Sequence, residues 1–441
     1  MYKVIQHIDL KTSVDRKLKK AIWLYFFLLI FEGALRKWFL PSLSDALLVV
    51  RDPLAIWILY YSWKHKILKK NIFLISMFGL GSLGIITALL FGHSNIFVAL
   101  FGARIYLLHF PLIFIIGGVF NERDVINLGR IMIYLAIPMT ILIALQFYSP
   151  QSAWVNRGVG GNLEGAGFAG AMGYFRPPGT FSFTMGTTLF YSFLAVYIFY
   201  FWFSKAKINN LLLTLSTFCL IASIPLAISR ALFYSICLTF LFVLFSLIFN
   251  REKLQKLLLV TGVLIVFGAL LSNFEFFSTP LDVIVKRFEQ ANEVEGGVSN
   301  SLVDRIFGYM FRGFVESRDV PFFGYGIGMG TNVGSQLMTG DRKFLIAEME
   351  YGRIIGEMGL VMGSGIILVR LLFAIKLSLI SFKSLKDGNL LPWLLLSVGL
   401  LILIQGQWAS TMNLGFTVVI IGLAQALLKD ENISTLRKEI Y

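Results

Sequence analysis

Twelve long apolar runs constrain the fold of this chain more than any other feature. A helix needs roughly 20 apolar residues to cross the hydrocarbon core of a bilayer. Runs of about that length cover residues 21–40, 45–63, 72–91, 96–118, 130–148, 181–203, 210–228, 231–249, 257–273, 351–375, 390–406 and 412–428. They do not alternate polar with apolar residues, so they predict helices and not barrel strands. With 57% hydrophobic and only 15% charged residues, the chain is expected to be an all-α polytopic membrane protein of about twelve transmembrane helices.

The basic residues of the short loops predict the orientation. If the N-terminus is cytoplasmic and the spans alternate, the inner loops and tails hold 23 of the 39 Lys and Arg residues. Cytoplasmic loops carry such an excess of basic residues in membrane proteins. We therefore expect both termini in the cytoplasm. The net charge of +14 is then explained by topology, and no nucleic-acid partner is expected.

The same pattern divides the chain into five parts. Residues 1–20 form a cytoplasmic tail, 21–273 hold nine spans with a glycine-rich outer loop at 149–180, 274–350 form a large outer loop, 351–428 hold three spans, and 429–441 form a second tail. In the large loop, Thr279-Pro280 reads as a helix start, and a second helical pattern follows Ser301. Such amphipathic helices would lie on the outer leaflet or cover a cavity.

Lysine and arginine are distributed unequally between the two faces. Eighteen of the 23 inner basic residues are Lys, whereas twelve of the fifteen placed at or beyond the outer face are Arg. A guanidinium offers a planar, always-charged fork that grips phosphate or carboxylate with two hydrogen bonds. The outer face is therefore suited to an anionic ligand. The alternative is that these arginines pair with the acidic residues of the same loops.

Several charged residues fall inside or beside predicted spans, where they are costly and usually face a cavity or a partner. Arg104 lies about two turns into its span and is a functional candidate. Glu32, Arg36, Arg51 and Asp52 are interpreted as a structural cluster at the interface.

A second group of charges begins the span after the large loop. Glu348, Glu350, Arg353 and Glu357 enter an otherwise apolar segment, and the last three share one helix face. These carboxylates could act as a general base or orient the arginine, or the group could be a mutually paired ion cluster. Just before them, the alternating glycines of residues 321–330 could bring backbone N–H groups close to phosphate. No Cys/His spacing predicts a metal site, and no cofactor is expected.

Four segments resemble one family of bacterial envelope enzymes, the O-antigen ligase and O-antigen polymerase superfamily. The similar segments, in order, are Arg176-Pro177-Pro178-Gly179-Thr180-Phe181 before a span, Ser229-Arg230-Ala231 between two spans, Pro321 to Gly330 in the large loop, and Glu357-Met358-Gly359-Leu360 entering the next span. The likeness covers roughly residues 130–425. The segment from Glu32 to Trp38, followed by Arg51-Asp52-Pro53, resembles one subgroup of the polymerases.

The resemblance implies a lipid-sugar glycosyltransferase-type fold in the bacterial inner (plasma) membrane. The implied activity joins undecaprenyl-diphosphate-linked oligosaccharide repeat units into O-antigen or exopolysaccharide at the periplasmic face, without metal or nucleotide. Candidate partners are that glycan donor, the lipid bilayer, and a chain-length regulator and flippase of the same pathway. The expected catalytic residues are Glu348, Glu350, Arg353 and Arg230, and the expected substrate-binding residues are Arg176, Arg104, Arg305 and Glu357.

One position departs from the family pattern. Many members place His nine residues before the signature Glu, and this chain has Glu348 there. The departure favours a polymerase over an O-antigen ligase, which stays an alternative. A lipid-linked-sugar flippase or transporter is a second alternative, and a non-catalytic assembly factor is a third.

Overall fold

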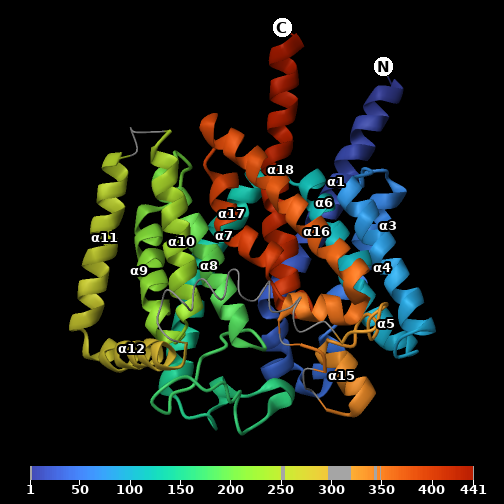
Figure 1. Ribbon diagram of the computed structural model, residues 1–441. Helices are drawn as coiled ribbons and strands as arrows, with labels where there is room; N and C mark the ends of the chain where they lie inside the picture. The colour runs from blue at the N-terminus through green and yellow to red at the C-terminus, as the bar shows by residue number, and fades with distance from the viewer. Residues whose placement is uncertain (1, 250–253, 296–318, 342–344, 348, 441) are drawn as a thin grey trace.

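The computed structural model describes residues 2–249, 254–295, 319–341, 345–347 and 349–440 as a bundle of helices. Figure 1 shows the long helices packed side by side, with the two termini projecting from the same end of the bundle. The helices are α1 (Tyr2–Ala34), α2 (Ser44–Leu47), α3 (Arg51–Lys64), α4 (Ile72–Leu90), α5 (Ile96–Arg104), α6 (Phe110–Val119), α7 (Glu122–Tyr148), α8 (Thr184–Phe203), α9 (Asn210–Leu226), α10 (Arg230–Leu247), α11 (Leu254–Asn273), α12 (Glu275–Glu295), α15 (Asn332–Thr339), α16 (Glu350–Lys386), α17 (Leu391–Ile404) and α18 (Thr411–Ile440). Short helical turns join some of them: η1 (Leu35–Phe39), η2 (Pro41–Leu43), η3 (Ile105–His109), η4 (Trp154–Asn156) and η5 (Val159–Gly161).

The helices bear out the expected class of protein. In the described residues, seven helical segments are long and apolar enough to cross a membrane, with α5, η3 and α6 together as one of them, or eight if the bent pair α11 and α12 counts as one span. The other predicted spans fall on α1, α3, α9 and α17, of which the last three have 14 to 17 residues. The chain is an all-α multi-pass membrane protein, and no strand occurs in the parts that the structure describes. The count of twelve spans and the cytoplasmic termini stay predictions.

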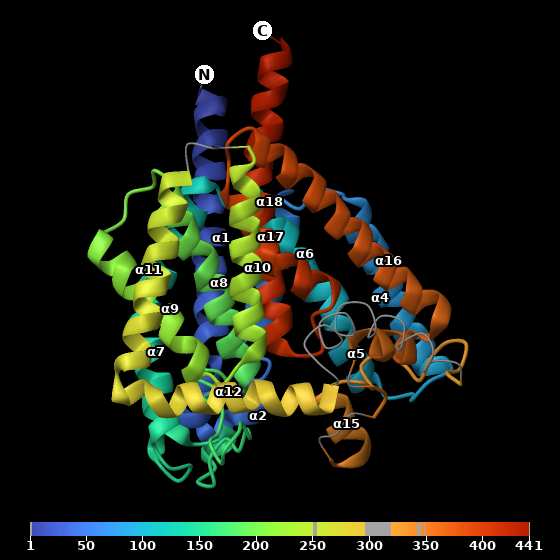
Figure 2. The same cartoon turned by 60° about the vertical axis from the view of Figure 1, so that its left-hand side comes forward.

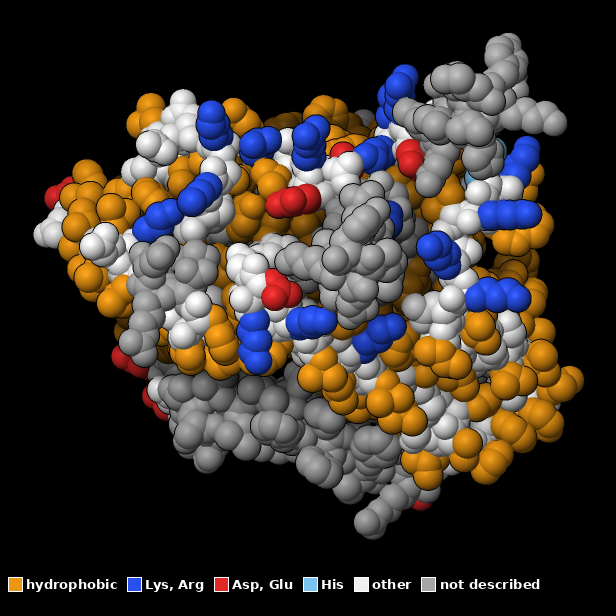
Figure 3. Space-filling view, turned by 90° about the horizontal axis from the view of Figure 1, so that it is seen from above, with side chains coloured by type: hydrophobic (Ala, Val, Ile, Leu, Met, Phe, Trp, Pro, Cys, Tyr) orange, Lys and Arg blue, Asp and Glu red, His pale blue; other side chains and the backbone are white. Residues whose placement is uncertain are grey.

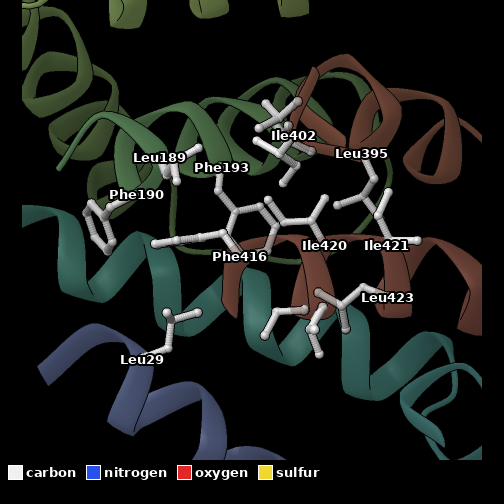
Figure 4. Packing of buried hydrophobic residues seen from close by; sticks show 14 of the residues in the cluster. Leu29, Leu189, Phe190, Phe193, Leu395, Ile402, Phe416, Ile420, Ile421 and Leu423 are labelled. Carbon is white, nitrogen blue, oxygen red and sulfur yellow. The ribbon is translucent and has the colours of Figure 1, made fainter. Parts of the chain in front are cut away.

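The centre of the bundle is formed by α8 and the first half of α18, whose side chains are almost all buried. Figure 4 shows Phe416 and Ile420 of α18 beside Phe193 of α8 and Ile402 of α17. Peripheral helices such as α10 and α11 instead leave large apolar side chains exposed, Leu241 and Leu258 among them. This apolar exterior is what a lipid solvent requires.

Two predicted boundaries are wrong. The predicted span 351–375 starts inside a helix that is broken at Gly359, where φ is 73° and ψ is 170°, and its second arm continues to Lys386. A Cβ at this position would collide with the carbonyl oxygen of Phe322, so the break depends on glycine. The loop helix expected to start at Thr279-Pro280 instead begins at Glu275, and Pro280 lies inside it.

The helix α12 lies across the end of the bundle opposite the termini, and Figure 2 shows it running beneath α9, α10 and α11. It turns by 101° from α11. Pro280 has no N–H for the carbonyl of Phe276 one turn earlier, and the hydroxyl of Tyr148 donates a hydrogen bond to that carbonyl instead. The second helix expected in this loop, after Ser301, lies outside the described residues.

Candidate functional site

Arg176 leaves a small hairpin at the end of the bundle opposite the termini. Ala169 and Phe175 form an antiparallel bridge, and the N–H of Arg176 donates to the carbonyl of Phe168 at 2.7 Å. The two prolines that follow set the direction of the chain, and the turn at Gly179 is locked by hydrogen bonds from Lys37 and Gln146 to its carbonyl. A rigid turn therefore precedes α8, and it fixes the backbone that carries Arg176.

Two consecutive threonines of α8 form hydrogen bonds with the residues next to Arg176 and Arg230 in the chain. The hydroxyl of Thr187 donates to the carbonyl of Pro177, the residue after Arg176, at 3.3 Å. The hydroxyl of Thr188 pairs with that of Ser229, the residue before Arg230, at 3.0 Å. Ser229 is also the N-cap of α10 and accepts from the N–H of Leu232, so Arg230 begins that helix in a fixed position.

A third arginine reaches the same place from α12. The Arg287 guanidinium donates to the carbonyl of Gly170, inside the hairpin that leads to Arg176, at 3.2 Å. The next residue, Phe288, packs edge-on against Phe233 and Tyr234 of α10, with ring centroids 5.7 and 6.0 Å apart. The apolar face of α12 therefore anchors Arg287 beside the start of α10.

We name Arg176, Arg230 and Arg287 the arginine triad. Burial first, and then the charges of Arg287 and Arg230, lower the pKa of Arg176 to about 10. The lowered pKa still leaves Arg176 charged at neutral pH. No ion pair involves Arg176 among the described residues, and its buried Nε has no hydrogen-bond partner. Three like charges held together in this way form a site suited to an anion with several oxygens.

The predicted charges at the start of α16 form a closed network instead. Glu350 accepts from Arg353 Nε at 2.9 Å and from Arg370 at 2.6 Å, and Arg353 donates to Glu357 at 2.6 Å. The N–H of Trp408 donates to Glu350 as well. All four charged side chains are buried. A carboxylate surrounded by this many donors is a poor general base, because its charged form is already stabilised.

The break at Gly359 explains why Arg370 takes part. It turns the second arm of α16 back past the first, so that Glu350 and Arg370 meet although they are 20 residues apart. Arg370 also donates to the carbonyls of Leu403 and Gly406 and lies 3.9 Å from the ring centroid of Trp408. The network therefore braces α16 against the connection between α17 and α18.

The alternating glycines of residues 321–330 cap the first arm of α16. The N–H groups of Tyr325 and Gly326 donate to the carbonyls of Gly356 and Glu357 at 2.8 and 3.0 Å. The N–H of Gly330 donates to the Glu357 carboxylate at 2.9 Å. These N–H groups are used within the protein, so they do not form the phosphate-binding backbone that the sequence suggested as a possibility.

Arg104 belongs to another paired cluster, between α1, α3 and the end of α5 with the η3 turn that follows it. It donates to Asp52 at 2.5 Å, and Asp52 also accepts from His109 at 2.9 Å. The same ring of His109 pairs with the hydroxyl of Tyr25 at 3.0 Å. Neighbouring ion pairs join Glu32 to Arg36 and Arg51, at 3.6 and 3.2 Å. The four residues interpreted as a structural cluster are therefore all engaged in ion pairs.

The structure thus brings together only some of the predicted site residues. Arg176 and Arg230 lie in the arginine triad, whereas Arg104, Glu350, Arg353 and Glu357 are paired with opposite charges elsewhere. Arg305 and Glu348 lie outside the described residues. Among the described residues, no group of three or more His, Cys, Asp or Glu side chains could hold a metal ion. Sequence reasoning missed Arg287, although its place beside Phe288 on an amphipathic helix was a usable signal.

The fold and the site together define a multi-pass helical membrane protein with a cluster of arginines at one end. Searches against models of protein families and against curated proteins find no match for this chain.

Proposed function

We propose that this chain is a glycosyltransferase that joins undecaprenyl-diphosphate-linked oligosaccharides into a bacterial envelope polysaccharide, at the membrane face where the arginine triad lies. The observation that carries the proposal is the arginine triad itself, in which Arg176 is partly buried, has a buried Nε with no hydrogen-bond partner, and has no acidic partner among the described residues. A diphosphate on a lipid carrier matches this site in charge and in its number of acceptor oxygens. The resemblance to O-antigen polymerases supports the same substrate class.

The proposed reaction requires only that the protein stabilise a leaving group and accept a proton. The acceptor hydroxyl would attack the anomeric carbon of the donor sugar, and the bond from that carbon to the diphosphate oxygen would break. The departing diphosphate gains negative charge during this step. Fixed guanidinium groups facing that charge stabilise the transition state more than the ground state. Arg176, Arg230 and Arg287 are the residues proposed for this role.

The general base is proposed from the sequence. Glu348 is the family-equivalent position, and Glu350 is occupied by two arginines and a backbone N–H. We therefore propose Glu348 as the proton acceptor. Glu350, Arg353 and Glu357 become positioning residues, because their contacts hold the loop of residues 321–330 against the first arm of α16.

The direct test uses purified protein in liposomes that contain an undecaprenyl-diphosphate-linked glycan. Release of undecaprenyl diphosphate together with longer glycan marks polymerisation, transfer to a lipid A core acceptor marks a ligase, and movement of intact donor marks a flippase. Arg287→Gln is expected to lower release about a hundredfold or more. Its matched control is Lys286→Gln, the next residue on α12, whose exposed side chain pairs only with the exposed Glu289 among the described residues. Equal activity of both variants would remove Arg287 from the proposal.

A further inference from the structure

A second basic site lies at the opposite end of the bundle, where both termini project. A hollow of about 320 Å³ lies between α7 and the connection from α8 to α9, and it is lined by Arg130, Tyr134, Lys207, Ile208 and Asn209. Seen from this end, Lys and Arg side chains are scattered over much of the face of the molecule and outnumber the acidic ones (Figure 3). The hollow is thus part of a positively charged face and is distinct from the arginine triad.

Arg130 is held in place on the wall of this hollow. One of its terminal nitrogens donates to the side chain of Asn127 at 2.6 Å, and the other donates to the backbone carbonyl of Lys207 at 3.2 Å. A guanidinium carries five N–H groups, so donors remain for a ligand. The two contacts fix the plane of the group at low entropic cost, which is the condition for gripping a phosphate with two hydrogen bonds.

Other basic residues lie near Arg130, and one of the two acidic residues at the start of α7 is paired elsewhere. Lys207 is exposed at the rim, and Lys256 of α11 reaches the carbonyl of Ser204 in the same connection at 3.5 Å. On α7, Asp124 pairs with Lys19 at 2.6 Å. Glu122 lies eight residues before Arg130, which is about 12 Å along a helix. A ligand in the hollow would therefore meet mainly positive charge.

The surface that continues from the hollow is apolar. Tyr134, Ile141 and Leu145 of α7 are exposed by 61%, 57% and 51%. Their spacing places them on one side of the helix, and Arg130, four residues before Tyr134, lies at the end of this stripe. A molecule with a charged head and a long apolar chain could therefore occupy both surfaces at once.

We infer that this hollow binds the phosphate of an anionic phospholipid, with one acyl chain along the stripe of Tyr134, Ile141 and Leu145. Basic pockets between helices on the cytoplasmic side of membrane proteins bind headgroups of this kind. Arg130 supplies the bidentate contact, Lys207 adds charge at the rim, and Tyr134 lies at the boundary between headgroup and chain. The inference does not depend on the proposed glycosyl transfer.

The test measures the phospholipid that stays bound to the intact protein. Protein is purified from nanodiscs of mixed phosphatidylglycerol and phosphatidylcholine, and bound lipid is identified by native mass spectrometry. Wild type is expected to retain phosphatidylglycerol preferentially. The double variant Arg130→Ala, Lys207→Ala is expected to bind it about thirty-fold more weakly, because each basic residue contributes about fivefold. The control double variant Lys69→Ala, Lys383→Ala removes the same charge from exposed sites and is expected to behave as wild type.

Three outcomes would overturn the inference. The first is equal retention of phosphatidylglycerol by the Arg130/Lys207 variant and by wild type. The second is an equal loss in the control variant, which would assign binding to net charge alone. The third is displacement of the lipid by millimolar inorganic phosphate, which would mark a site for free phosphate. If the double variant does not accumulate, Lys207→Glu replaces it, because the contact of Lys207 with Arg130 is made by its backbone carbonyl.

Discussion

Replacing Arg176 with glutamine should make the protein more stable and less active. At neutral pH this arginine is charged in both the folded and the unfolded chain, so its lowered pKa represents a cost carried by the folded state. A fall from the ordinary value to about 10 corresponds to roughly 3 kcal/mol. Arg176 is only partly buried, so solvent screening reduces this to about 1–2 kcal/mol. Glutamine removes the charge and the repulsion from Arg230 and Arg287.

The assay is thermal unfolding of purified protein in detergent, followed by tryptophan fluorescence. The Arg176→Gln variant is expected to melt about 1–2 °C above wild type. Inorganic diphosphate should raise the melting temperature of wild type, because it binds only the folded state, and should raise that of the variant much less. Transfer activity should fall about a hundredfold or more. Lys286→Gln, with an exposed side chain, serves as the control.

Destabilisation by Arg176→Gln would refute this reasoning. It would show that Arg176 makes a favourable contact in the folded protein. It would also show that repulsion among the three guanidinium groups of the triad does not destabilise the fold. An equal response of wild type and variant to diphosphate would contradict the anion site while leaving the stability argument intact.

Three further predictions concern residues that hold α16 and the start of α10 in place. Gly359→Ala should cost more than about 2 kcal/mol, because its φ of 73° and the Phe322 carbonyl both exclude a Cβ, and it should prevent accumulation in membranes. The control Gly262→Ala should be tolerated, because no other segment of the described chain comes within 4 Å of a Cβ at this position on α11. Equal levels of the Gly359→Ala and Gly262→Ala proteins on an immunoblot would contradict the account. Arg353→Met should destabilise by about 3–5 kcal/mol, because it leaves the buried Glu357 carboxylate without a cationic partner while Glu350 keeps Arg370. Normal melting with lost activity would instead favour a direct catalytic role for Arg353. Thr188→Val removes the hydroxyl that pairs with Ser229, so it should lower the melting temperature slightly and the activity several-fold. Unchanged activity would show that this hydrogen bond does not position Arg230.

The sequence was sufficient for the class of fold because span length and apolarity are local properties. Every predicted span falls on a helix, although α16 shows how a single glycine can shift the bounds. The shared face of Glu350, Arg353 and Glu357 was also predictable from helical spacing, and the ion pairs confirm it. Arg370 was not predictable as their partner, because its approach depends on the break at Gly359.

The candidate site was predictable only in part for a similar reason. Arg176 and Arg230 stand next to turn residues at span ends, which made both visible in the sequence. Their closeness depends on Thr187 and Thr188 of α8, and that contact joins segments far apart in the chain. The amphipathic pattern around Phe288 indicates a helix that carries Arg287, but the approach of Arg287 to Arg176 depends on α12 folding across α10, a tertiary contact that periodicity does not reveal.

A calorimetric titration with a short polyprenyl diphosphate, farnesyl diphosphate, tests most directly whether the guanidinium groups of residues 176, 230 and 287 hold a lipid diphosphate. Wild-type protein in detergent should bind it saturably and more tightly than farnesyl monophosphate. Each single glutamine substitution in the triad should weaken binding at least about tenfold. Unchanged affinity in all three variants, or equal affinity for the two farnesyl phosphates, would contradict the account.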